Sequence, residues 1–268
     1  MSPLKESIKT LKDTLDRLYL RLNRREFVHP DPLEYLYRYE DLYDREIAGL
    51  VASGLAYGRV SQILNAAGSV LDELGDSPSR FLGETSLETL QSLFCDFRYR
   101  FTQGLEVACI LKAASDLQIE YRSLGNLLTH AVSSKGYIEA LELMIVAIMR
   151  KAGLSTSSML SMPSKGSACK RLNLWMRWMV RSDDVDPGGW EGIESSMLYV
   201  PLDTHMFRVA KLLGFTSRRA ADWRAVEEAT EGFRTLCPDD PVKYDFSLTR
   251  FGIRDDLDMN GLLKGLEF

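Results

Sequence analysis

MPSKGSACKRLNLWMRWMVRSDDVDPGGWEGIESSMLYVPLDTHMFR, residues 162–208, is the segment around which the rest of the chain is organised. It contains a glycine-bearing turn, an amphipathic helix, a loop rich in proline and glycine, and the start of a second helix. Two ionisable residues stand at helix starts: Lys170 in the first turns of the first helix, and Asp203 where the loop meets the second. Each is placed at a helix end that could face a shared cleft.

Asp203 is followed by apolar residues at helical spacing, namely Met206, Val209, Ala210 and Leu213. This pattern predicts that Asp203 is the N-cap, where its carboxylate accepts backbone N–H bonds at the positive end of the helix dipole. A carboxylate held in this way could also stabilise developing positive charge or hold a water molecule. From the pattern alone, a pure capping role and a catalytic role both remain open.

Lys170 lies near the start of its helix, where the helix dipole disfavours a cation by roughly 1 kcal/mol at most. Because this penalty falls on the ammonium form, it favours a free amine that could act as a nucleophile. Arg171, Arg177 and Arg181 follow on the same helix and add to the effect. The alternative interpretation is a solvated basic face.

The motif around Asp203 resembles that of the helix-hairpin-helix DNA glycosylases, the endonuclease III-like proteins. Their catalytic aspartate lies in a Val-Asp-Thr-His motif followed by Phe and Arg, and this chain has LDTHMFR at residues 202–208. Residues 244–252 fall where the family has a late apolar helix that ends in a glycine. The resemblance implies that Asp203 is catalytic and that its partner is a lysine after a glycine-rich hairpin.

The position of that lysine is more similar to the position found in the archaeal 8-oxoguanine glycosylase branch than to that in the endonuclease III branch. In the endonuclease III pattern the hairpin lysine precedes the aspartate by fewer than the 203 − 170 = 33 positions found here, and strict register places Ala168 at the lysine. In the archaeal 8-oxoguanine glycosylase branch, the lysine opens a helix and a longer insert follows. This nearer resemblance implies that Lys170 is catalytic, with Lys165 as the alternative. The whole chain also resembles an uncharacterised family of bacterial proteins related to these glycosylases.

The composition predicts a protein that buries a sizeable core, because 45% of the 268 residues are hydrophobic. No apolar run approaches the length of a membrane span, and the N-terminus lacks the apolar core of a secretion signal, so we expect a cytoplasmic protein without a membrane partner. The cysteines are too scattered for a zinc or cluster motif, so we expect reduced thiols, no metal and no cofactor. They are Cys95, Cys109, Cys169 and Cys237.

The net charge of −5 does not favour DNA binding, which normally requires a basic face. Basic residues do concentrate in residues 17–25 and 165–181, whereas acidic residues gather in 31–46, 183–186 and 255–258. We therefore expect a local basic surface beside the proposed cleft, with modest and strongly salt-dependent binding to undamaged DNA.

Helical periods dominate the chain and predict an all-α fold. We expect one unit of two interleaved helical lobes that flank a cleft and include a helix-hairpin-helix element. The lobes are predicted at residues 30–154 and at 155–254 together with the N-terminal helix (4–22), and residues 255–268 form a tail. The alternating sequence FRYRF at 97–101 is predicted to be helix or loop.

Aromatic residues near the insert are predicted to pack in the core. Trp175 and Trp178 lie three positions apart on one helix, which places them on one apolar face. For Trp190, on the loop rich in proline and glycine, a buried anchor is favoured over stacking on a base. Arg98 and Arg100 are candidate phosphate or rim contacts.

Residues 44–74 resemble the paired helices of the glycosylases, whose intervening turn offers a polar side chain where the base leaves the duplex. Here the turn is AYGRVSQ at residues 56–62, and the usual glutamine near its start is missing. Tyr57 and Arg59 would then provide the wedge and a phosphate contact, or Gln62 would do so from one turn later. Ordinary turn residues are the alternative.

Taken together, the resemblance implies a DNA glycosylase that flips a modified base out of double-stranded DNA and acts as a monomer. The base would be an oxidised purine such as 8-oxoguanine, in repair, or a bulky cytosine such as glucosylated hydroxymethylcytosine, in defence against phage. Lys170 would form a Schiff base with the sugar and give AP lyase activity, or Asp203 would activate a water molecule. The alternative is a non-catalytic DNA-binding or partner-binding protein on the same scaffold. The predicted DNA contacts on the hairpin and the following helix are Lys165, Gly166, Ser167 and Arg171.

Overall fold

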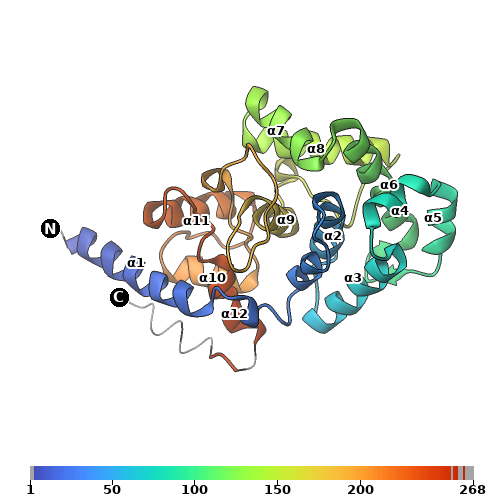
Figure 1. Ribbon diagram of the computed structural model, residues 1–268. Helices are drawn as coiled ribbons and strands as arrows, with labels where there is room; N and C mark the ends of the chain where they lie inside the picture. The colour runs from blue at the N-terminus through green and yellow to red at the C-terminus, as the bar shows by residue number, and fades with distance from the viewer. Residues whose placement is uncertain (1–2, 255, 259–261, 263–268) are drawn as a thin grey trace.

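The computed structural model describes residues 3–254, 256–258 and 262 (Figure 1). Helices dominate these residues, so the predicted all-α class is confirmed. The α-helices are α1 (Pro3–Leu22), α2 (Leu42–Gly54), α3 (Val60–Leu74), α4 (Pro78–Glu84), α5 (Leu87–Leu93), α6 (Gly104–Tyr121), α7 (Leu124–Lys135), α8 (Tyr137–Lys151), α9 (Lys170–Val180), α10 (Thr204–Leu212), α11 (Trp223–Leu236) and α12 (Asp245–Ile253). The 3-10 helices are η1 (Arg25–Phe27), η2 (Pro32–Arg38), η3 (Pro163–Lys165) and η4 (Ser195–Met197).

A short hairpin interrupts the helices, made of β1 (Arg98–Tyr99) and β2 (Thr102–Gln103) in antiparallel register. The prediction of helix or loop for residues 97–101 was therefore wrong for Arg98 and Tyr99, whereas residues 97, 100 and 101 do lie in loop or turn. The alternation follows the two faces of a strand, since Tyr99 is buried and Arg98 is exposed. Arg100 makes the turn with a left-handed backbone, at φ 50°.

The helices pack in two groups (Figure 1). On one side α12 packs against α1 and α10, and α10 also packs against α11. On the other side α6 packs against α4, α5, α7 and α8, and α3 packs against α4. Helix α2 lies between the two groups and packs against α9. Gly49 permits this crossing, because a Cβ atom there would lie 2.8 Å from the Trp175 ring of α9.

Buried Glu46 ties α2 to both the start of α7 and the loop that follows α9. Trp190 of that loop is only 5% exposed and donates from Nε1 to Glu46 over 2.6 Å, which confirms it as a buried anchor. Trp175 and Trp178 are also buried, as predicted. The other donors to the Glu46 carboxylate are Gln118 Nε2, Ser123 Oγ, Leu124 N and Gly125 N. Five donors on one carboxylate hold α2, α6, the start of α7 and the loop after α9 in fixed positions.

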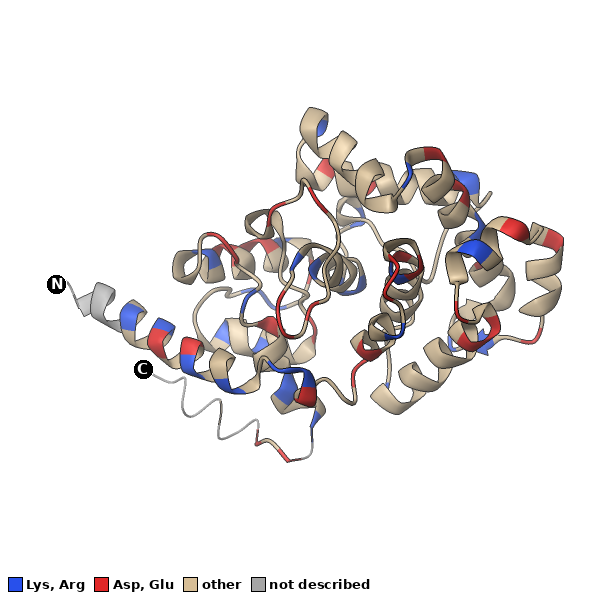
Figure 2. Cartoon of the chain, viewed as in Figure 1, with Lys and Arg blue, Asp and Glu red and all other residues tan. Residues whose placement is uncertain are grey.

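Charged residues of both signs are interspersed along the helices, as α1 shows (Figure 2). In the predicted basic stretch, Arg177 and Arg181 are only 2% and 5% exposed. The expected basic surface at 165–181 is therefore largely internal, and Lys165 is its exposed cation. Among the described residues, no helix is both long enough and apolar enough to cross a bilayer.

Candidate functional site

Lys170 and Asp203 line the same cavity, which has a volume of about 50 Å³. Helix α9 begins at Lys170, and Asp203 is the N-cap of α10, where its carboxylate accepts from Met206 N over 2.8 Å. The predicted cap and the predicted helix start are thus confirmed. The other walls of the cavity come from the start of η2, the α2–α3 turn with the first residues of α3, and α12. Two residues that are distant in sequence therefore meet at one small internal space.

The Lys170 side chain is partly buried and spans from α9 to the end of α2. Its Nζ donates to Ala56 O over 3.3 Å, and among the described residues it forms no ion pair. The preceding residue, Cys169, has a left-handed backbone at φ 47°, a conformation that costs a non-glycine residue roughly 1–3 kcal/mol. Burial raises the pKa of the Cys169 thiol, which makes it a poor nucleophile. Lys170 is therefore the nucleophilic candidate at this helix start.

Asp245, the first residue of α12, is one of three aspartates in the cavity lining, with Asp31 and Asp203, and it is only 1% exposed. Its Oδ2 accepts from Arg177 Nη1, whereas its Oδ1 has no hydrogen-bond partner among the described residues. Burial raises the pKa of Asp245 to about 6, opposed by the charge of Arg177 and reinforced by the nearby carboxylate of Asp203. The sequence places Asp245 only within the expected late helix at 244–252, because nothing local marks it as buried.

A buried ionic network extends from Asp245 through α9 into the loop after it. Arg177 Nε contacts Asp186 Oδ1 at 3.2 Å, and Arg181 binds the other oxygen of that carboxylate. The two guanidinium groups form ion pairs with four carboxylates, those of Asp183, Asp186, Asp240 and Asp245. Burial raises the pKa of Asp186, although both arginines oppose the rise. The network therefore has fewer cationic groups than carboxylates, and it fixes the loop and α12 against α9.

Tyr57, the predicted wedge, packs against the β-hairpin. Its hydroxyl donates to Tyr99 O over 2.9 Å and lies 2.7 Å from Thr102 Oγ1. Its ring stacks on that of Phe101, with centroids 6.4 Å apart. Phe101 at the tip of the hairpin is 77% exposed, so the hairpin presents a bare ring beside the predicted wedge.

Arg171, a predicted DNA contact, points into the protein. Its Nη1 donates to Gly54 O over 2.8 Å and also to Ser158 O, and its guanidinium lies 4.9 Å from the centre of the Tyr57 ring. Burial lowers the pKa of Arg171. In this arrangement Arg171 ties the end of α2 to the loop before η3.

The remaining predicted DNA contacts lie on the surface. Arg59 and Gln62 are exposed at the start of α3. The other exposed contacts are Lys165, Gly166 and Ser167 of the hairpin segment.

The backbone N–H groups from residue 164 to 166 already have acceptors. Ser164 N donates to Glu142 Oε1 over 2.5 Å, and Gly166 N donates to Pro163 O over 2.8 Å. Lys165 N likewise donates to a backbone carbonyl. The side chains of Lys165 and Ser167 are therefore the groups of this segment best placed for phosphate.

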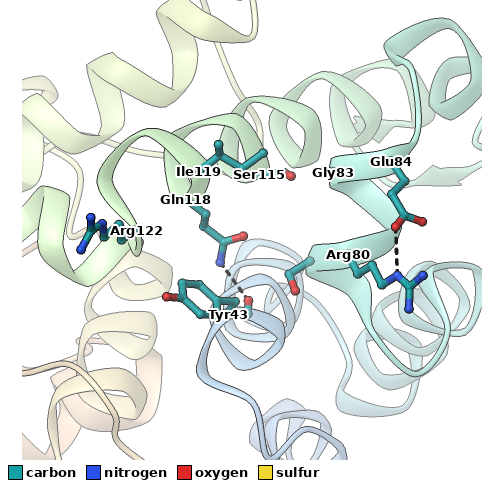
Figure 3. A pocket seen from close by; sticks show the side chains of 9 residues that line it. Tyr43, Arg80, Gly83, Glu84, Ser115, Gln118, Ile119 and Arg122 are labelled. Atoms are coloured by element: carbon teal, nitrogen blue, oxygen red, sulfur yellow. Dashed lines mark hydrogen bonds and ion pairs between the residues drawn. The ribbon is translucent and has the colours of Figure 1, made fainter.

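A wider groove of about 460 Å³ lies between α2, α4 and α6 (Figure 3). Some of its polar side chains are paired with protein groups: Gln118 Nε2 donates to Tyr43 O over 2.8 Å, and Arg80 contacts Glu84 at 2.9 Å. None of the predicted site residues lines it. The small cavity, with its nucleophilic and acidic side chains, is the better candidate for chemistry. No cluster of three or more metal-ligating side chains occurs within the described part of the chain.

Residues 31–254 match the family described as "Protein of unknown function (DUF2400)", and the chain belongs to this family. No curated protein and no solved structure matches the chain.

Proposed function

We propose that this DUF2400 protein is a DNA glycosylase that excises a modified base, with Lys170 as the nucleophile and Asp203 as the carboxylate that stabilises the sugar cation. One observation carries the proposal: Lys170 and Asp203, which resemble the catalytic pair of the helix-hairpin-helix DNA glycosylases and are 33 positions apart, line one cavity. Among the described residues, no other cation lines the cavity without a carboxylate partner, because Arg177 and Arg250 are both ion-paired.

In the proposed architecture, the two helix groups flank a DNA-binding cleft, and residues 162–167 form the hairpin of a helix-hairpin-helix element. The exposed side chains of Lys165 and Ser167 would contact phosphate, which positions the duplex without reading its sequence. Arg59 and Gln62 would approach the duplex from the α2–α3 turn. The protein would act as a cytoplasmic monomer, without metal or cofactor.

The chemistry follows from a lysine side chain and a carboxylate that line one cavity. Lys170 Nζ bonds to C1′ of the flipped nucleotide, the glycosidic bond breaks, and the base leaves with that electron pair and takes up a proton. Asp203 stabilises the positive charge that develops on the sugar. Opening of the sugar ring then gives a Schiff base to Lys170, and removal of a C2′ proton expels the 3′ phosphate. If Asp203 instead activates a water molecule, the base alone is released.

The cavity must widen to admit a base, because its 50 Å³ is far below the roughly 300 Å³ at which ligand pockets begin. The contact from Lys170 to Ala56 O closes it on the side of the α2–α3 turn. Breaking this contact frees the amine and moves the turn that carries Arg59. DNA binding at the turn and opening of the cavity are therefore coupled in this proposal.

The test is borohydride trapping on duplexes that carry oxidised purines, alkylated or deaminated bases, or glucosylated hydroxymethylcytosine. Wild type should form a covalent adduct with one class, Lys170→Gln should form none, and Asp203→Asn should form it at least about a hundred-fold more slowly. Lys165→Gln is the matched control, since it removes the alternative lysine. Loss of the adduct in Lys165→Gln but not in Lys170→Gln would reassign the nucleophile. Base release without an adduct would favour the water mechanism.

A non-catalytic partner-binding protein on the same scaffold is the second candidate. It is favoured by the net charge of −5 and by the burial of Arg177 and Arg181, which leave little basic surface for DNA. If no duplex binds at low salt in an anisotropy titration, and none forms an adduct or loses its base, the result would support this candidate against the glycosylase.

A further inference from the structure

Among the described residues, Asp245 Oδ1 is a buried acceptor without a hydrogen-bond partner, and it belongs to a residue that lines the cavity of Lys170 and Asp203. A buried polar atom without a hydrogen bond costs roughly 1–3 kcal/mol. Seven side chains of the described residues contain such an atom, and Asp245 is the one among them that lines this cavity. The other oxygen of this carboxylate is occupied by Arg177. The free oxygen is therefore available to a ligand that enters the cavity.

The surrounding charges define what this oxygen would bind. The buried network pairs four carboxylates with two guanidinium groups, so it accepts further donors and repels further anions. The cations that line the cavity are already engaged: Arg177 with Asp186, Arg250 with Asp31, and Lys170 with Ala56 O. A neutral group that donates N–H bonds fits this environment, and a phosphate does not.

We propose that Asp245 is the specificity residue of this cavity and that its Oδ1 accepts a hydrogen bond from an exocyclic amino group of the flipped base. This inference rests on the proposed glycosylase function and narrows its substrates to amino-bearing bases. A keto oxygen in place of the amino group would face Oδ1 with no hydrogen between the two acceptors, and this unpaired contact disfavours the keto base.

Asp245→Asn should reverse this preference. Arg177 has only donors, so the amide oxygen must turn towards it, and the amide NH₂ then occupies the place of Oδ1. The cavity would present a donor where it had an acceptor. We therefore expect the variant to prefer the base that carries a keto oxygen.

The experiment compares duplexes that differ in one group: a 5-hydroxymethylcytosine duplex with a 5-hydroxymethyluracil duplex, and the corresponding amino and keto pair of an oxidised purine. Each is used as the normal nucleotide for trapping and as a non-cleavable 2′-fluoro analogue for binding, measured by fluorescence anisotropy. Wild type should bind the amino member of a pair roughly ten- to a hundred-fold more tightly. Asp245→Asn should lose or invert that ratio.

The matched control is Asp240→Asn, which removes another carboxylate of the network, on Arg181, and does not line the cavity. It should keep the wild-type ratio. If trapping occurs but Asp245→Asn keeps the wild-type ratio, the proposed role of Asp245 is refuted and the glycosylase function is supported. If no duplex is trapped or loses its base, but selective binding disappears in Asp245→Asn, the glycosylase function is refuted and the role of Asp245 in binding the base is supported. Neither trapping nor selective binding on any duplex would overturn both.

Discussion

Asp245 should make the stability of the protein depend on pH in a direction opposite to that of an ordinary paired aspartate. Its pKa is raised from 3.8 to about 6, chiefly by burial. An acid whose pKa is higher in the folded than in the unfolded state stabilises the fold fully below pH 3.8, and this contribution is lost as the pH rises through 6. A rise of roughly two pKa units corresponds to about 3 kcal/mol, of which about 2 kcal/mol falls between pH 4 and pH 8.

The Asp245→Asn variant isolates this contribution, because the amide has a similar shape, keeps an acceptor for Arg177 and does not titrate. Urea unfolding at pH 4 and pH 8 gives the free energy of unfolding of each protein. From pH 4 to pH 8, wild type should lose about 2 kcal/mol relative to the variant. Other titrating groups contribute to both proteins and largely cancel in the difference.

Thr249→Ala is the control for this measurement. Thr249 lies one turn further along α12, lines the same cavity and carries no charge, so its difference from wild type should be the same at both pH values. If the difference between wild type and Asp245→Asn also changes by less than about 0.5 kcal/mol, the buried carboxylate is not destabilised by its surroundings. The account of a network short of cations would then be wrong.

Two further substitutions test the helix packing and the DNA surface. Gly252→Ala places a Cβ atom 2.5 Å from the His205 ring, so we expect it to lower the free energy of unfolding by about 1–3 kcal/mol and to slow trapping by shifting Asp203. Gly83→Ala on α4 is the control in urea unfolding and should cause no such loss, because a Cβ atom there has room. An equal loss of stability in the two variants would exclude the predicted clash. Phe101→Ser should weaken duplex binding about ten-fold by removing a stacking ring, with the slope of affinity against salt unchanged. An unchanged anisotropy titration would exclude the hairpin tip from the DNA surface.

The local features of the site could be predicted from the sequence. The apolar period after Asp203 predicted its capping role, and Lys170 does begin a helix. Such features depend on residues within one or two turns of each other, where spacing alone determines which side chains meet. The burial of Trp175 followed from the same periodicity.

Long-range features could not be predicted in this way. In the sequence Asp245 looks like an ordinary acidic residue in the first turn of a helix. Its buried position depends on packing between segments far apart in the sequence, as its contact with Arg177, 68 positions away, shows. The sequence likewise predicts that Arg181 belongs to a basic face, yet Arg181 forms an ion pair with Asp240 of a distant loop. The hairpin was missed because strands of two residues are too short for alternation to identify.

The contact between Arg177 and Asp245 also determines how the two candidate catalytic residues face each other. Lys170 is carried by α9, which packs against α2, whereas Asp203 is carried by α10, which packs against α12. The buried pair joins α9 to α12 and so links the two carriers. Under the proposed function, an amino group that binds Oδ1 would stabilise the ionised form of Asp245 and strengthen this link. The correct base would thereby tighten the alignment of Lys170 with Asp203, so that recognition and catalysis depend on the same buried ion pair.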